Sequence, residues 1–391
     1  MMTLALLAAA AYIFLRVVRP LRSSWWVKTA LSAFILLAAF KFQIISVMGG
    51  EMYFAPDVPA SILIAGAWAF AAFLLYFFLL LAKNILLDLV KLFQFLIGKI
   101  RRRSWTAASA EAIQVYDNRI NLVLLVVAAA LSAWGVKEGH RMPRVRELTV
   151  EVAALPSEAE GMRIAVLADL HVHQLLRASF VRGVVRQVQA LKPDLILIAG
   201  DFVDGSVSAR GEDLLPLKEL SAPEGVYGVA GNHEYYSDYR AWRPFLVKEL
   251  GIDMLDNRHI LLRDGSLALV GVTDPAADFQ GLEAPDFSAA LQGIRQGVPV
   301  LLLAHRPSLA RDAAARGVNL QFSGHTHGGM VLGLDRLVAL FNAGFVSGQY
   351  RVGSTTLLVS NGTGIWNGFP VRLGAPAEIL LVRLISGASA D

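Results

Sequence analysis

The 391-residue sequence contains no cysteine. Disulfides, thiolate metal sites and cysteine nucleophiles are therefore excluded, and any metal ion must be held by nitrogen and oxygen ligands. Charged residues are also scarce, at 17% of the chain, whereas hydrophobic residues make up 55% and the mean hydropathy is +0.51. This composition is apolar for a soluble protein and indicates that part of the chain lies in a membrane.

Charge is distributed unevenly along the chain. Residues 1–136 carry 12 Lys and Arg against 5 Asp and Glu, a net charge of +7, and residues 137–391 carry 24 against 27, a net charge of −3. A nucleic-acid-binding protein concentrates basic residues on its globular domain. Because the C-terminal region is slightly acidic, nucleic acid is excluded as the expected partner.

Four apolar runs predict a membrane anchor of about four helices, at roughly 2–15, 29–48, 60–82 and 119–136. The first run is short, so a signal peptide is the alternative interpretation. Arg16, Arg19 and Arg22 follow this run and no basic residue precedes it, which favours a membrane span. The third run continues to Ile97 with charges interspersed, which predicts a helical extension or an interfacial helix.

The basic residues between these runs predict the orientation. The first and third connections carry eleven Lys and Arg in total, whereas the second carries Glu51 and Asp57 and no basic residue. Basic connections stay cytoplasmic, so four spans leave the C-terminal domain outside. We therefore expect a multi-pass protein of the cell (inner) membrane with an extracytoplasmic, or periplasmic, globular domain. Four basic residues that follow the last span oppose this orientation: Lys137, Arg141, Arg144 and Arg146.

Beyond the anchor, the sequence predicts a linker at 137–147, an α/β domain at 148–385 and a tail at 386–391. Apolar strand-like runs in this domain repeatedly end in Asp, Asn or His. Since the carboxyl ends of parallel strands meet at one edge of a sheet, these polar side chains are expected to form a site there. The five motifs are Asp169-Leu170-His171, Gly200-Asp201, Gly231-Asn232-His233-Glu234, His305 and Gly324-His325-Thr326-His327.

The order and form of these motifs resemble the calcineurin-like metallophosphoesterases over about residues 148–385. Asn361-Gly362-Thr363-Gly364 and Pro376-Ala377-Glu378-Ile379 are similar to the membrane-anchored bacterial branch, related to transmembrane proteins with a metallophosphoesterase domain. The resemblance implies an α/β fold of four layers, α/β/β/α, in which helices flank two mixed sheets.

The resemblance also implies two divalent metal ions. One would be held by Asp169, His171, Asp201 and His327, and the other by Asp201, Asn232, His305 and His325, with Asp201 shared. Nitrogen and oxygen ligands without sulfur suit Mn²⁺, Fe or Zn²⁺. Two such ions lower the pKa of a bridging water, and the resulting hydroxide attacks phosphorus while the ions stabilise the entering and leaving oxygens.

Two further residues are expected to take part in catalysis. The resemblance implies that His233 is not a ligand and donates a hydrogen bond or proton to the leaving oxygen. Asp204 is the candidate carboxylate that orients its ring. His173, Arg306 and Arg372 are candidates for substrate contact; the alternatives are a solvated His173 and salt bridges for the two arginines.

Large apolar residues lie in the connections after the last metal motif. One interpretation is an apolar mouth that faces the bilayer and receives a lipid tail, and the other is ordinary packing. The residues are Leu334, Leu337, Leu340, Phe341, Trp366 and Phe369.

These observations predict a membrane-bound phosphoric ester hydrolase acting on a phosphodiester or pyrophosphate of a lipid-linked substrate, with the bilayer as its partner. An alternative is a hydrolase of the UDP-2,3-diacylglucosamine pyrophosphatase type, from lipid A synthesis. That reaction requires a cytoplasmic site, which conflicts with the predicted orientation. A third interpretation is a non-catalytic receptor or scaffold, which predicts lost ligands, whereas every motif ligand is present.

Overall fold

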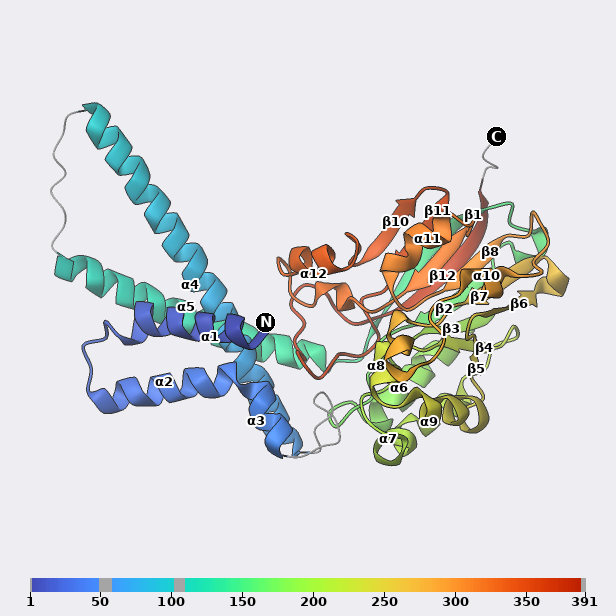
Figure 1. The fold of residues 1–391 in the computed structure, drawn as a ribbon, viewed down its shortest axis with the longest axis horizontal. Coiled ribbons are helices and arrows are strands. Elements are labelled where there is room, and N and C mark those ends of the chain that lie inside the picture. The colour runs from blue at the N-terminus through green and yellow to red at the C-terminus, as the bar shows by residue number, and fades with distance from the viewer. Residues whose placement is uncertain (1, 49–57, 102–109, 388–391) are drawn as a thin grey trace. The chain divides into compact units, whose positions relative to one another are not determined.

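A computed structural model describes residues 2–48, 58–101 and 110–387 (Figure 1). Contacts divide the chain after Val136 into an N-terminal helical unit and a C-terminal unit that begins at Lys137. The helices of the first unit are α1 (Met2–Ile13), α2 (Trp25–Ala39), α3 (Lys41–Met48), α4 (Ala60–Arg101) and α5 (Ala110–Gly139), the last of which continues past the division.

The described helices include two that are long and apolar enough to cross a membrane, Ala60–Ile97 and Tyr116–Gly139. A third span is formed if α2 and α3, which meet at a 71° bend, are counted together. The first predicted span belongs to a shorter apolar helix, Thr3–Val18. The described helices therefore give two or three candidate spans and do not clearly give the predicted four, because a 71° bend separates α2 from α3 and the first apolar helix is short.

Helix α4 continues without a break beyond its predicted span, as a helical extension. Within this unit Nζ of Lys83 on α4 lies 2.7 Å from Oδ1 of Asp117 and 2.6 Å from Oδ1 of Asn121, both on α5. Pairing of this kind offsets the cost of placing charged groups among apolar helices.

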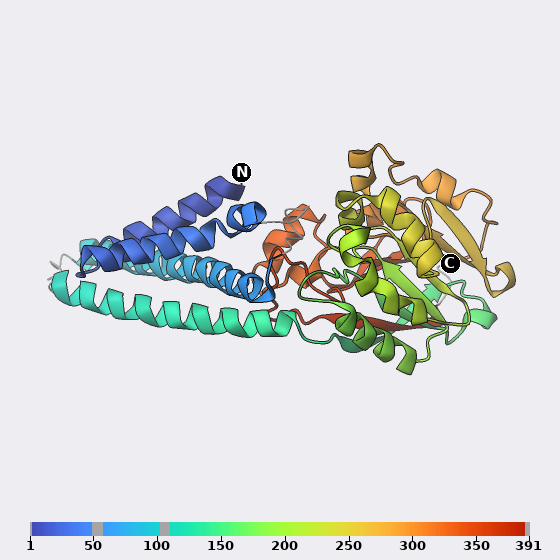
Figure 2. The ribbon, with the colours of Figure 1, turned by 90° about the horizontal axis from the view of Figure 1, so that it is seen from below.

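The C-terminal unit contains two mixed sheets, each of six strands within the described residues (Figure 2). The first sheet has the order β1-β12-β2-β3-β4-β5 and the second β10-β11-β9-β8-β7-β6. The strands are β1 (Arg144–Ala153), β2 (Arg163–Leu167), β3 (Leu195–Ala199), β4 (Val226–Val229), β5 (Asp253–Met254), β6 (Arg258–Leu262), β7 (Leu267–Gly271), β8 (Val300–Leu303), β9 (Leu320–Ser323), β10 (Gly348–Val352), β11 (Thr355–Val359) and β12 (Glu378–Gly387).

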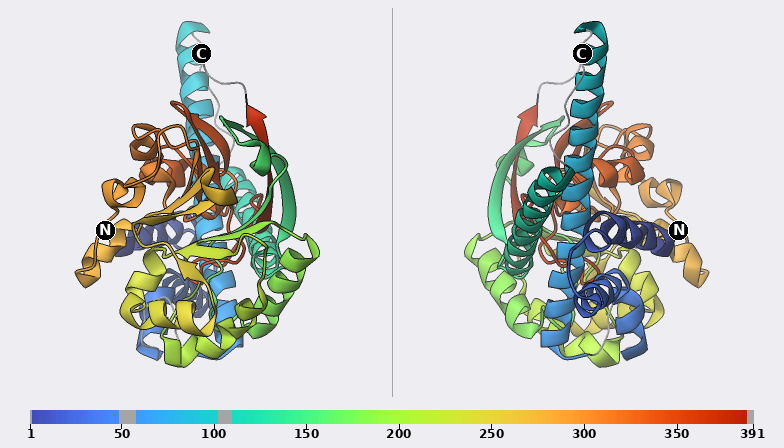
Figure 3. Two further views of the ribbon diagram at one scale, coloured as in Figure 1. Left: turned by 90° about the vertical axis from the view of Figure 1, so that its right-hand side faces the viewer. Right: turned by 90° about the vertical axis from the view of Figure 1, so that its left-hand side faces the viewer.

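Helices cover the outer faces of two stacked sheets in this unit (Figure 3), and three buried apolar clusters lie between these layers. Alternate residues of β3 point to opposite faces, so Leu197 packs between the two sheets while Ile198 packs with the helices outside the first sheet. The order helix, sheet, sheet, helix confirms the predicted two mixed sheets flanked by helices. The helices are α6 (Ala178–Ala190), α7 (Val207–Leu214), α8 (Asn232–Tyr236), α9 (Tyr239–Pro244), α10 (Phe287–Leu291), α11 (Ala310–Ala314) and α12 (Asp335–Phe341).

The segment between anchor and domain differs from the predicted linker at 137–147. Helix α5 continues to Gly139, and β1 begins at Arg144, where it pairs in parallel with β12. Only residues 140–143 connect the two elements. The sequence pattern hid this because the first half of β1 is largely exposed and carries the charged residues Arg144, Arg146 and Glu147. At the other end, β12 extends to Gly387, past the predicted boundary at 385.

Parallel pairing places the polar motifs together. Strands β2, β3 and β4 are parallel in the first sheet, and β7, β8 and β9 are parallel in the second. The residues that follow these strands therefore emerge at the carboxyl edges of the sheets.

Candidate metal centre

The predicted ligands converge from both sheets. Asp169 and His171 follow β2, Asp201 follows β3, and Asn232 begins α8 after β4. His305 follows β8, and His325 and His327 follow β9. Three groups of side chains, each with ligand atoms within 4.8 Å of one another, could hold a cation: Asp169 with His171 and His327, His171 with Asp201 and His233, and Asp201 with His305 and His325.

Asp201 lies between the two sides of this cluster. Its Oδ2 is 3.4 Å from Nε2 of His171 and 3.3 Å from Nε2 of His305. Asn232 joins the His305 side, with its Oδ1 3.1 Å from Nε2 of His305. The seven predicted ligands therefore lie in one cluster, with Asp201 common to both sides.

The loops that carry the cluster have unusual backbone conformations. Asp169, His171, Asp201, His325 and His327 all have positive φ, between +43° and +73°. Such conformations cost roughly 1–3 kcal/mol each for residues other than glycine and are concentrated at functional sites. The strain indicates that surrounding contacts hold these backbone conformations, which place the side chains in the cluster.

Two glycines allow the loops to approach so closely. A Cβ at Gly231 would lie 2.2 Å from Oδ1 of Asp201, and one at Gly364 would lie 2.0 Å from the carbonyl oxygen of Leu170. No side chain fits at either position. The glycines of these motifs are thus explained by close packing around the cluster.

The directions of the imidazole nitrogens fit bound cations. Nδ1 of His305 faces the carbonyl oxygen of Ala199 at 2.7 Å, which places the Nδ1 proton there. In the neutral ring Nε2 then presents a lone pair to Oδ1 of Asn232, to Oδ2 of Asp201 and to Nδ1 of His325, which is 3.2 Å away. Two of these atoms are oxygens that only accept hydrogen bonds, so the arrangement calls for a positive charge among them.

The second side of the cluster has the same property. Nδ1 of His171 donates to Oδ1 of Asp204 at 3.0 Å, and its Nε2 faces Nε2 of His327 at 3.1 Å. Two imidazole nitrogens directed at each other beside the Asp201 carboxylate suit a shared cation. The residues present therefore fit a dinuclear site with nitrogen and oxygen ligands.

The pKa values show how strongly this cluster attracts positive charge. Burial lowers the pKa of His305, but the charges of Asp201 and Asp169 outweigh burial and raise it to about 10. Burial raises the pKa of Asp201, but His305 and His233 outweigh it and hold the pKa well below its ordinary value. Asp201 thus stays ionised in a buried site and favours a cation beside it, either a proton or a metal ion.

His233 and Asp204 lie together as predicted. Oδ1 of Asp204 is 2.6 Å from Nδ1 of His233 and 3.0 Å from Nδ1 of His171, so one carboxylate contacts both rings. The backbone N–H of His233 donates to Oδ1 of Asp201 at 2.9 Å. Burial lowers the pKa of His233, but Asp201 and Asp204 outweigh it and raise the pKa to about 9. The ring is thereby fixed at the edge of the cluster.

The three predicted substrate contacts have other partners. Arg372 is fully buried, and its guanidinium donates to the backbone carbonyls of Asn361 at 2.7 Å, Gly364 at 2.6 Å and His327 at 3.3 Å. This corrects its prediction as a substrate residue: Arg372 holds the loops behind the site. Arg306 forms the alternative salt bridge, with its Nε 2.8 Å from Oδ2 of Asp274.

His173 is also fully buried, and neither a substrate contact nor a solvated side chain describes it. Its Nδ1 lies 2.5 Å from the carbonyl oxygen of His171. Burial lowers its pKa to about 4, so the ring is neutral. His173 therefore supports the backbone of a ligand loop.

Glu234 was missed as a site residue by the sequence analysis. Its Oε2 accepts from the backbone N–H of Asp201 at 2.9 Å and of Gly231 at 2.7 Å. Its Oε1 accepts from Phe202 at 2.7 Å and Val203 at 3.2 Å. One buried carboxylate thus fastens the loop after β3 to the loop after β4. The only signal in the sequence was its place in the motif, beside Asn232 and His233.

Aromatic rings surround His233. The ring centroid of Tyr236 lies 5.6 Å from that of His233, and Trp366 lies 6.3 Å away. Phe279, which is largely exposed, lies 6.0 Å from Tyr236. Trp366 therefore belongs to the site, whereas Phe369, predicted in the same apolar group, is buried.

The site consists of buried histidines and carboxylates at the edge of two stacked mixed sheets. This arrangement is typical of hydrolases that use two metal ions. A model of the calcineurin-like phosphoesterase family matches residues 162–329. Together with the relatives below, this match shows that the chain belongs to the calcineurin-like metallophosphoesterases. It is a metal-dependent phosphoesterase.

The similarity to known metallophosphoesterases extends well beyond the five motifs. The chain is 32% identical over 301 residues to the transmembrane protein with metallophosphoesterase domain of Danio rerio, covering 74% of this chain and 67% of that protein. It is 36% identical over 253 residues to an uncharacterized metallophosphoesterase of Helicobacter pylori, covering 64% and 66%. It is 30% identical over 263 residues to one of Aquifex aeolicus, covering 66% and 98%. The chain thus spans about two thirds of the length of the first two relatives.

The contacts of Glu234 predict the effect of Glu234→Gln. Glutamine has the same size as glutamate, but its NH₂ group replaces one of the two carboxylate oxygens. That NH₂ group would face backbone N–H donors and could not accept hydrogen bonds from them. We expect metal affinity to fall by about 10- to 100-fold, as for other groups that orient ligands. Metal titration of the purified full chain measures this, with the exposed Glu249→Gln as the control. Unchanged affinity would contradict the assigned role.

Proposed function

We propose that this protein is a membrane-bound phosphodiesterase or pyrophosphatase that hydrolyses a lipid-linked phosphate ester with two divalent metal ions. The position of Asp201 between His171 and His305 carries the proposal, because it joins two groups of ligands into one dinuclear arrangement. The family supports the class of reaction, and the two or three candidate spans support a substrate that resides in a membrane. The proposed cations are Mn²⁺, Fe or Zn²⁺.

The proposed ligands are those that the sequence predicts. Asp169, His171 and His327 would hold one ion, and Asn232, His305 and His325 the other, with Asp201 shared. Such a pair of ions polarises a phosphate ester and activates water for in-line attack. Asp169 and Asp201 offset the charge of the ions, while Glu234 holds the two loops at a fixed separation.

His233 is proposed to protonate the leaving oxygen. Its Nδ1 lies 2.6 Å from Oδ1 of Asp204, and Nε2 is the nitrogen that we propose acts on the substrate. Asp204 fixes the ring and favours its protonated form. Tyr236 and Trp366, which flank His233, would contact the group that leaves.

The sequence is compatible with two other functions. A non-catalytic scaffold predicts lost ligands, whereas all seven are present and clustered. A UDP-2,3-diacylglucosamine pyrophosphatase-type hydrolase would use the same metal site but requires a cytoplasmic domain. The second candidate therefore depends on orientation, for which the basic connections favour the extracytoplasmic, or periplasmic, side.

His233→Ala tests the assigned acid. We expect turnover of an aryl phosphodiester to fall by about 10²- to 10⁴-fold while metal content stays at the wild-type value, because the ring protonates the leaving group and does not hold an ion. Turnover and metal content are measured on the same preparation. His259→Ala is the matched control, since that ring bonds the backbone of Ala290 on another part of the second sheet. Wild-type turnover by His233→Ala would disprove the role.

A reporter fused after Asp391 tests the orientation. An alkaline phosphatase fusion, active only outside the cytoplasm, is expected to be active, and a green fluorescent protein fusion, fluorescent only inside, is expected to be dark. The reverse pattern would contradict the extracytoplasmic proposal. It would favour a nucleotide-linked lipid as the substrate.

A further inference from the structure

Helix α12 and the loop before it expose large apolar side chains. Leu332 is 81% exposed, Leu340 77% and Phe341 86%, and Leu337 is also exposed. Leu337, Leu340 and Phe341 stand at i, i+3 and i+4, which places them on one side of the helix. These four residues are called the α12 surface. A soluble domain seldom exposes large apolar residues in such a group, so the surface indicates an apolar partner.

The α12 surface is fastened to a second segment, residues 365–377. The backbone N–H of Leu332 donates to the carbonyl oxygen of Leu373 at 2.8 Å, and Val331 forms bridges with Leu373 and Gly374. A Cβ on Gly374 would lie 3.0 Å from Cβ of Leu332. The α12 surface and segment 365–377 therefore form one continuous part of the C-terminal unit.

The same segment packs against the end of helix α5. A Cβ on Gly139 would lie 2.9 Å from the carbonyl oxygen of Pro370 and 3.1 Å from Cδ1 of Ile365. Gly139 is also the last residue of the candidate span Tyr116–Gly139. A span ends where the chain leaves the apolar layer of the bilayer. Segment 365–377 is thus packed against the last residue of this candidate span.

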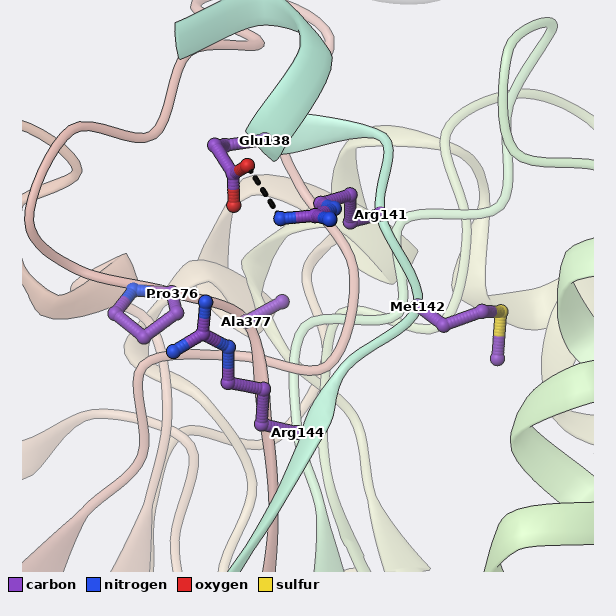
Figure 4. A pocket seen from close by; sticks show the side chains of 6 residues that line it. All are labelled: Glu138, Arg141, Met142, Arg144, Pro376 and Ala377. Atoms are coloured by element: carbon purple, nitrogen blue, oxygen red, sulfur yellow. Dashed lines mark hydrogen bonds and ion pairs between the residues drawn. The ribbon is translucent and has the colours of Figure 1, made fainter. Parts of the chain in front are cut away.

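A basic cavity lies at this same point. It has a volume of about 320 Å³ and is lined by Glu138, Arg141, Met142, Arg144, Pro376 and Ala377 (Figure 4). Arg141 pairs with Glu138 at 2.6 Å, which leaves the charge of Arg144 in excess in the lining. Basic residues just outside a span attract the phosphates of lipid headgroups. The charge of the cavity therefore complements a lipid surface.

From these contacts we infer that the α12 surface inserts into the interfacial layer of the bilayer that α5 crosses. The cavity with Arg141 and Arg144 then lies at the level of the lipid phosphates. Apolar helix faces of this kind bury about 5–10 Å into the boundary between headgroups and acyl chains. Arg336, on the same helix with an 88% exposed side chain, extends toward the headgroups.

Insertion would bring the candidate metal centre to the membrane surface. Leu332 follows the proposed ligand His327 by five residues, and a Cβ on Gly329 would lie 2.5 Å from Cα of Asp335 at the start of α12. The loop after His327 is therefore packed directly on the inserted helix. This inference goes beyond hydrolysis, because insertion does not require an active enzyme.

The absence of cysteine permits a direct test with the full chain in lipid nanodiscs that contain phosphatidylglycerol. Phe341→Cys carries an environment-sensitive fluorophore, and Leu340→Cys is a second position. We expect a blue-shifted emission and a loss of emission when the discs contain lipids brominated near the carbonyl. Leu261→Cys is the control, because Leu261 is 48% exposed on β6, at the opposite edge of the second sheet from β10.

Labels at Phe341 and Leu340 that respond like the label at Leu261 would overturn the inference. An alternative result is a blue shift that brominated lipid does not quench, with crosslinking between two Phe341→Cys chains. That result would assign the α12 surface to contact with a second copy and would also overturn the inference. Quenching is expected to persist when Asp201→Asn is added. Loss of hydrolysis and loss of insertion are therefore measured separately.

Discussion

Oδ2 of Asp201 lies within 3.4 Å of Nε2 of His171 and of Nε2 of His305, and this carboxylate connects ligands that come from different sheets. A buried carboxylate is costly unless positive charge and hydrogen bonds compensate for its lost hydration. The backbone N–H of His233 supplies one such bond, and Glu234 holds the Asp201 backbone in place. The strained loops at the edges of the two sheets place the other proposed metal ligands around this carboxylate.

Buried residues around the proposed ligands hold the ligand rings and loops in place. Asp204 orients two imidazole rings, and Arg372 holds five backbone carbonyls behind the site. Burial lowers the pKa of Arg372 to about 10, which leaves its guanidinium charged at neutral pH. A buried arginine of this kind is stable because the carbonyl oxygens accept from it, and the same bonds fix the loop after His327. The ligand loops are therefore held by buried hydrogen bonds, whereas Tyr236 beside His233 is 41% exposed.

Much of this could be predicted from the sequence. Apolar strands that end in Asp, Asn or His placed the ligands at one edge, because parallel strands share an edge and the motifs follow β2, β3, β4, β8 and β9. Glu234 and Arg372 could not be assigned in this way. Their roles depend on backbone amides and carbonyls, which carry no sequence signal, and a guanidinium is ordinarily expected on the surface. Four spans are not clearly present in the described helices, because hydropathy does not reveal the 71° bend between α2 and α3.

Asp201 is proposed to be shared by two metal ions. Metal analysis of the purified full chain by mass spectrometry tests it most directly, on wild type and on Asp201→Asn. We expect two ions per chain in the wild type and loss of metal from both positions in Asp201→Asn, because a neutral amide cannot offset two dications. An Asp201→Asn chain that retains two ions would contradict the account.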